Sequence, residues 1–166
     1  EEARRGEGGV DNCFERCHAL QGLPRLVYGL LRGPLLRPDG DTQGLHGDTR
    51  ALAERLHTTQ PPADVARAAY PRLQAFVGVD DDAPSTLQLT RQAAEMSGAK
   101  VFVVDGQEHI LVAYTEAAAE EPFPPPPTSA LGRRLQRARE SRAGSVAVTH
   151  LRGADGDARL QALLLE

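Results

Sequence analysis

The chain is poor in aromatic residues. Its 166 residues include four phenylalanines, three tyrosines and no tryptophan, so a core must be built mainly from leucine, valine and alanine. Such a core buries less area per residue, and we expect modest stability. No run of roughly eighteen apolar residues occurs, so the sequence predicts no transmembrane span. Because the polar first residues lead into no apolar stretch, we also predict no signal peptide and expect a cytosolic protein.

Lysine is almost absent as well. Lys100 is the single lysine, beside 18 arginines. An arginine-rich binder of phosphate or nucleic acid is one interpretation. The other is the codon bias of a GC-rich genome, which raises arginine, alanine, glycine and proline together. The net charge of −4 opposes nucleic-acid binding, which gains from counterion release by an excess of basic groups. We therefore predict no nucleic-acid partner.

Motifs for catalysis are also lacking. Neither of the glycine-rich phosphate loops G-x-x-x-x-G-K and G-x-G-x-x-G occurs, and no serine or cysteine stands in a nucleophile-elbow context. The five histidines are scattered along the chain. His109 opens one predicted strand and His150 nearly closes another, so the two could approach each other if those strands pair. A small enzyme that uses His109 or His150 in a pocket is an alternative. The favoured prediction is that the chain is not an enzyme.

Only two cysteines are present. Cys13 and Cys17 stand with His18 in a C-x-x-x-C-H pattern, and no second ligand pair follows at the spacing of a zinc finger. On a helix, cysteines four residues apart share a face and behave as small buried residues. A disulfide is disfavoured by the expected cytosolic location. We predict neither a metal nor another cofactor in this chain.

The first half of the chain has helical periodicity. Residues 1–20 are predicted to form a flexible segment with a short helix, and residues 21–78 an all-helical domain. Two apolar stripes interrupted by proline, Leu23–Arg37 and Ala68–Phe76, lie in this domain and indicate packing rather than chemistry. A helix that begins at Asp48 lies between them.

After an acidic turn with proline, residues 79–84, the pattern becomes mixed, and residues 79–166 are predicted to form a second domain. An Asp-Gly turn indicates a hairpin between two apolar strands. The predicted elements are a helix at 85–98, strands at 100–104 and 109–114, a helix at 129–142, a strand at 145–151 and a helix from Asp157. The fold class is therefore α+β, an all-helical segment followed by a small mixed β-sheet flanked by helices.

Two features of the second domain indicate interaction surfaces. The helix at 129–142 carries several arginines outside an apolar stripe. They predict a surface for an acidic membrane or an acidic partner, or else a solvated face that suits the helix dipole. The residues assigned to that surface are Arg133, Arg134, Arg137 and Arg142. A proline run, Pro124, Pro125, Pro126 and Pro127, predicts either a docking segment for an aromatic-lined groove or a stiff spacer.

The order of these segments resembles one family. The first half of the chain resembles the helical domain of the cargo-adaptor subunit of the COPII inner coat, its larger Sec-type subunit. The segments that carry this resemblance are Leu23–Arg37, the helix from Asp48, and Tyr70-Pro71-Arg72-Leu73. The later helices and strands resemble the gelsolin-like domain that follows in that family. The resemblance covers residues 20–166, and Tyr-Pro-Arg-Leu is its most specific element.

The resemblance implies a non-catalytic protein-interaction module of a vesicle coat that transports proteins from the endoplasmic reticulum to the Golgi. The implied partners are the other inner-coat subunit in a heterodimer, cargo proteins and the outer coat, with peripheral contact to an acidic membrane. The implied location is cytoplasmic, at the endoplasmic reticulum membrane and COPII vesicles. Because the sequence stops inside a predicted helix at Glu166, we expect a fragment, with zinc in a domain upstream of it. The alternatives are the smaller, GTPase-activating inner-coat subunit and a gelsolin-like actin-binding module.

Overall fold

The computed structural model describes residues 17, 20–33, 35–36, 47–142 and 145–164. The chain divides into two compact units, Glu1–Arg55 and Leu56–Glu166. Most of the flexible segment with a short helix that is predicted for residues 1–20 lies outside the described residues.

The first unit contains helix α2, Leu23–Arg32. A proline in its first turn suits the helix start, and Gly33 ends it in an extended conformation. Several apolar side chains of α2 are exposed, among them Leu23, Val27 and Leu31, whereas Leu26 and Leu30 are half-buried. Helix α3, Gly47–Thr59, runs across the division between the two units.

The second unit contains a five-stranded mixed sheet in the order β2-β1-β3-β4-β5. Its strands are β1 (Arg72–Phe76), β2 (Ser85–Leu87), β3 (Val101–Asp105), β4 (His109–Tyr114) and β5 (Ala147–Arg152). Strands β1 to β4 pair antiparallel with their neighbours, whereas β5 pairs parallel to β4. The predicted α+β class with a small mixed sheet is confirmed.

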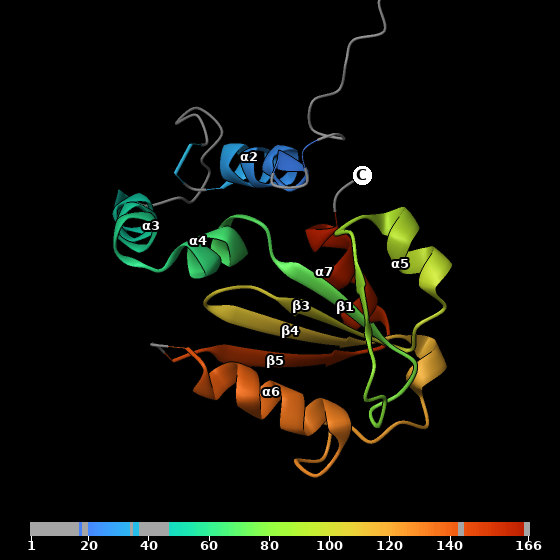
Figure 1. The fold of residues 1–166 in the computed structure, drawn as a ribbon. Helices are drawn as coiled ribbons and strands as arrows, with labels where there is room; N and C mark the ends of the chain where they lie inside the picture. The colour runs from blue at the N-terminus through green and yellow to red at the C-terminus, as the bar shows by residue number, and fades with distance from the viewer. Residues whose placement is uncertain (1–16, 18–19, 34, 37–46, 143–144, 165–166) are drawn as a thin grey trace, which may run out of the picture. The chain divides into compact units, whose positions relative to one another are not determined.

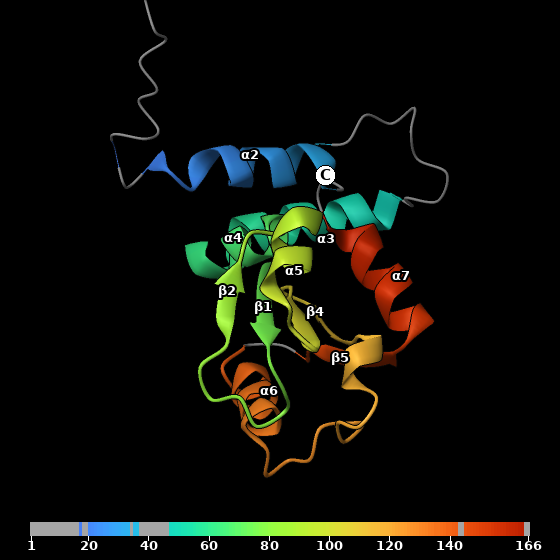
Figure 2. The ribbon, with the colours of Figure 1, turned by 90° about the vertical axis from the view of Figure 1, so that its right-hand side faces the viewer.

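Helices cover both faces of this sheet (Figures 1 and 2). Helix α6, Ala130–Glu140, lies on one face, and α5, Arg91–Ser97, lies on the other together with α7, Ala154–Leu163. Helix α4, Pro62–Ala69, precedes β1, and the short 3-10 helix η3, Glu116–Ala118, follows β4.

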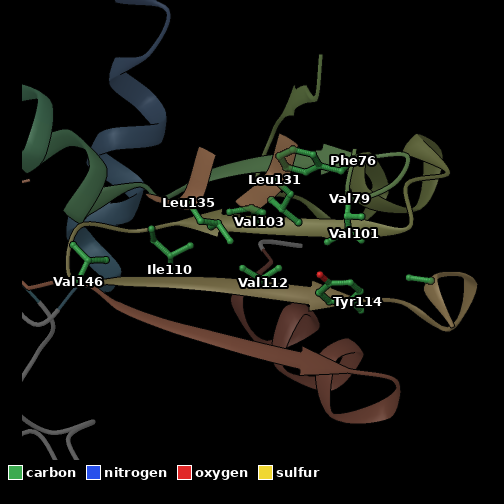
Figure 3. Close-up of a cluster of buried hydrophobic side chains, with 11 residues drawn as sticks. Phe76, Val79, Val101, Val103, Ile110, Val112, Tyr114, Leu131, Leu135 and Val146 are labelled. Atoms are coloured by element: carbon green, nitrogen blue, oxygen red, sulfur yellow. The ribbon is translucent and has the colours of Figure 1, made fainter. Parts of the chain in front are cut away.

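The two faces of the sheet carry separate apolar clusters, because successive side chains of a strand point to opposite faces. On the α6 face, Val103 and Val112 pack with Leu131 of the helix (Figure 3). On the other face, Phe102 and Leu111 pack in a cluster that includes residues of α5 and α7. Strands buried on both faces have continuous apolar sequence, which explains the runs that made β3 and β4 predictable.

Two segments that the sequence predicts to be helical each contain a strand in the structure. The domain predicted to be all helical over residues 21–78 contains β1, because α4 ends at Ala69 and Tyr70 is extended before Pro71. The residue before a proline is pushed out of the helical region by its ring. The helix predicted at 85–98 is β2 followed by α5, which starts after Thr90, whose hydroxyl accepts a hydrogen bond from the Ala93 N–H at 3.3 Å.

Candidate interaction surface

Helix α6 carries the arginine-rich face, and its start is fixed by Ser129. The Ser129 hydroxyl accepts a hydrogen bond from the Gly132 N–H at 3.0 Å and donates one to the Pro126 carbonyl at 2.7 Å. This side chain satisfies one of the free donors of the first turn. Leu131 and Leu135 are buried against the sheet, so the opposite side of α6 faces outward.

The arginines of α6 differ in their surroundings. Arg133, Arg137 and Arg139 are exposed and Arg134 is half-buried. The Arg133 guanidinium lies 3.4 Å from the Asp82 carboxylate, and both side chains are more than half exposed. In the part of the chain that the structure describes, no acidic side chain pairs with any of the other three.

Arg142 does not belong to this surface, and its assignment there was wrong. Its side chain is 2% exposed and forms an ion pair with Asp105. Its guanidinium also donates a hydrogen bond to the Gln107 carbonyl at 3.4 Å. Arg142 lies beyond the last residue of α6, so it is not on the exposed face of the helix and reaches the β3–β4 hairpin instead. A charge this deeply buried needs its partner.

Asp105 is the centre of a small ionic network. Besides Arg142, its carboxylate lies 3.9 Å from the Arg67 guanidinium of α4. Arg67 also donates hydrogen bonds at 3.3 Å to Gln107 and to Asp64. The network joins α4, the hairpin and Arg142, the second residue after α6. Sequence reasoning identified Asp105 only as a turn residue, because its partners are distant along the chain.

The proline segment packs on α6. Pro125 is buried, Pro126 is half-buried, and Pro124 and Pro127 are exposed. A Cβ atom placed on Gly132 would lie 2.0 Å from the Pro126 carbonyl oxygen, so glycine permits this close approach. The docking role of the segment stays a prediction. Of its four prolines, Pro124 and Pro127 are the exposed ones.

An open groove of about 460 Å³ lies between α6, the proline segment and β5. It is lined by apolar side chains, including Leu135 and Val148, and by His150. Arg133, Arg137 and Arg139 also line it, and none of the described lining residues is acidic. Three of the four arginines of α6 thus line one concavity, and two of them, Arg133 and Arg137, belong to the surface predicted from the sequence.

The histidines do not form a shared site. His109 and His150 lie on opposite faces of the sheet, because His109 is aligned with Ala147 and the two positions differ by an odd number along β5. The His109 ring lies 2.7 Å from the Thr149 hydroxyl. The His150 Nδ1 atom is buried and has no hydrogen-bond partner among the described residues, and burial lowers the pKa of His150. Strands β4 and β5 do pair, but the expectation that this pairing brings His109 and His150 together is wrong.

An aromatic cluster beside the groove was not foreseen from the sequence. The Phe123 ring is edge-on to Tyr114 at 5.1 Å between ring centroids, and the Arg152 guanidinium lies 5.3 Å from the Phe123 centroid. Arg152 also donates hydrogen bonds to carbonyl groups of the loop after β4. Burial raises the pKa of Tyr114 to about 12, an effect that the nearby Arg152 charge opposes.

Of the cysteine pattern, Cys13 and His18 lie outside the described residues, and Cys17 is exposed. Within the described ranges, no group of three or more His, Cys, Asp or Glu side chains is arranged to hold a metal ion. The helices of that same part of the chain are too short or too polar to cross a membrane.

Protein transport protein SEC23 D of Arabidopsis thaliana is 32% identical to this chain over 150 residues. The chain is similar to a Sec23 protein. The match covers 90% of this chain, so α6 and the strands β1 to β4 lie within it, but the chain spans only 20% of the relative. No family model matches the chain. The similarity to SEC23 D supports the resemblance to COPII coat proteins that the sequence indicates, without deciding which subunit the chain resembles.

Proposed function

We propose that this chain is a region of a COPII inner-coat subunit and acts as a non-catalytic protein-interaction module. The similarity to SEC23 D, at 32% identity over 90% of the chain, is the observation that carries the proposal. The fold supports it, since helices precede a small mixed sheet with helices on both faces, the order expected of a helical domain followed by a gelsolin-like domain.

The identity of the subunit within the coat is a finer proposal. The larger cargo adaptor and the smaller GTPase-activating subunit share this domain order. The smaller subunit is the one called Sec23, so the name of the relative favours it. In that case the chain would form part of the subunit that activates the coat GTPase, and residues outside this chain would also take part.

The proposed partners are the other inner-coat subunit, cargo proteins and the outer coat. The proposed location is the cytoplasmic side of the endoplasmic reticulum membrane and of COPII vesicles. Zinc is proposed only for a domain upstream of this chain. The exposed arginines of α6 and the groove beside them are the proposed contact surface.

A chimera tests the proposal. This chain replaces the matching 150 residues of SEC23 D, and recruitment to liposomes is measured with the remaining coat proteins and the GTP-loaded coat GTPase. The chimera should be recruited like the parent, whereas a version with a flexible linker in place of those residues should not be. Recruitment no better than that of the linker version would overturn the proposal.

The same reaction separates the alternatives. Faster GTP hydrolysis with the chimera than with the linker version favours the smaller subunit, and unchanged hydrolysis with normal recruitment favours the larger one. Co-sedimentation of the chain with actin filaments in calcium, lost on addition of a chelator, would instead support the gelsolin-like actin-binding module.

A further inference from the structure

The groove beside α6 combines positive charge with an apolar lining. Arg137 and Arg139 contribute the charge and have no acidic partner among the described residues, while Leu135 and Val148 are apolar. Arg133, at the same groove, has only its exposed ion pair with Asp82 at 3.4 Å. An occupant that supplies carboxylates together with some apolar side chains complements this lining.

The groove borders the open edge of the sheet. Strand β5 is the last strand in the sheet order and pairs only with β4 among the described strands. The Ala147 N–H donates to the Glu108 carbonyl and the Gly153 N–H to the Tyr114 carbonyl, both at 3.1 Å on the β4 side. Because backbone groups of alternate residues point to opposite edges, those of Val148 and His150 point to the open edge.

Such an edge can accept a further strand. An added strand lies about 4.8 Å from its neighbour, and every second side chain points to the same face. Beside β5, one set of those side chains would fall on the α6 side of the sheet, where Val148 and Arg137 line the groove. Figure 1 shows α6 running next to β5. Natural edges are often protected by proline, lysine or inward charges, and β5 has none of these before Arg152 at its end.

We infer that the open edge of β5 and the adjoining groove bind an acidic segment of a protein partner as an extended strand. Backbone hydrogen bonds to Val148 and His150 hold the segment, and its carboxylates on one side contact Arg137 and Arg139. This is the mode in which an extended peptide is added to an exposed sheet edge. A membrane is the less favourable occupant, since a lipid surface has no strand to pair with β5 and the arginines border a concavity.

This inference rests on the proposed function only in treating the chain as a protein-interaction module. The chimera experiment tests membership of the coat, whereas the experiment below uses the purified chain and a synthetic peptide. Loss of peptide binding with normal coat recruitment would overturn this inference and leave the proposed function standing.

The probe is a fluorescent peptide of alternating glutamate and valine, slightly longer than β5, and binding is measured by fluorescence anisotropy. A peptide with glutamine in place of glutamate should bind about tenfold more weakly. The double variant Arg137→Glu/Arg139→Glu should lose affinity for the glutamate peptide to a similar degree. Its matched control is Arg91→Glu/Arg159→Glu, which makes the same change in net charge at exposed arginines of α5 and α7, and it should retain most of the affinity.

Strand addition is tested separately from charge with the unchanged chain. Two versions of the peptide carry N-methyl groups on alternate residues. Each version thereby removes the backbone N–H groups along one edge of the extended peptide. One version blocks the edge that faces β5 and should lose binding, while the other should keep it. Equal binding of both versions would overturn the addition of the peptide as a strand. Absence of binding by the unmodified peptide would overturn the whole inference.

The membrane arm uses vesicles that contain phosphatidylserine. Vesicle binding that disappears in Arg137→Glu/Arg139→Glu, with no binding of the glutamate peptide, would assign the arginines to a lipid surface and overturn the inference. Circular dichroism of each variant verifies that the fold is intact. The N-methyl comparison decides the question even if a variant fails to fold, because it needs no substitution.

Discussion

Replacing Asp105 by asparagine removes the charge that compensates the most deeply buried arginine described in the structure. Asparagine keeps the shape of aspartate and suits a turn, so the change tests charge rather than backbone preference. The Arg142 side chain is 2% exposed and the Asp105 side chain 18% exposed. Breaking a buried pair leaves an uncompensated charge and costs about 3–5 kcal/mol of the free energy of unfolding.

The expected loss is large relative to the stability of a domain, which is about 5–15 kcal/mol. For a chain of this size it corresponds to a decrease in Tm of roughly 10 °C. Urea denaturation followed by circular dichroism measures the free energy, and a thermal scan measures Tm. The midpoint should shift without a change in the denaturant slope, since the surface exposed on unfolding stays the same.

The matched control is Asp82→Asn at the exposed ion pair with Arg133. The two side chains are 83% and 55% exposed, so solvent screens the pair and its loss should cost less than about 1 kcal/mol. The double variant Asp105→Asn/Arg142→Met should recover part of the stability lost in Asp105→Asn, because no buried charge is then left alone. Equal costs for Asp105→Asn and Asp82→Asn would refute the reasoning.

Three further substitutions test the packing and titration of the second unit. Gly132→Ala places a Cβ atom 2.0 Å from the Pro126 carbonyl oxygen and should cost about 1–3 kcal/mol in urea denaturation. Gln136→Ala on the exposed side of the same helix should stay within about 0.5 kcal/mol, and equal costs would contradict the close contact. Tyr114→Phe should be neutral or stabilising in the same assay, because the Tyr114 hydroxyl is buried without a described partner; a loss above about 1 kcal/mol would contradict this. Burial lowers the pKa of His150, so the unfolded state binds more protons and stability falls as the pH decreases through about 6.5. His150→Gln should make the urea midpoint less sensitive to pH between about 7.5 and 5.5, and an unchanged pH dependence would count against a neutral buried imidazole.

The hairpin shows where local sequence was sufficient. Two continuous apolar runs flank Asp105 and Gly106, and both runs are strands buried on both faces. Helix α6 was equally predictable, since Ser129 caps it and its apolar stripe has helical spacing. In these segments the local preference of the chain and the demands of the sheet agree.

Local sequence misled where the surroundings decided the outcome. The spacing of Leu73 and Phe76 suits a helix, yet β1 pairs with β3 and buries these residues on opposite faces of the sheet. From the sequence, Arg142 looks like the exposed arginines that precede it. Only in the folded chain does Asp105 lie close enough to form a buried ion pair with Arg142.

The sequence by itself determined the class of fold, the hairpin and the charged helix, because apolar spacing, turns and caps act between residues close along the chain. Only the tertiary structure placed the arginines of α6 beside the open edge of β5, on the face of the sheet opposite to His109. It also showed that the proline segment packs against Gly132. These arrangements depend on strand order and on contacts between distant residues, which periodicity cannot encode.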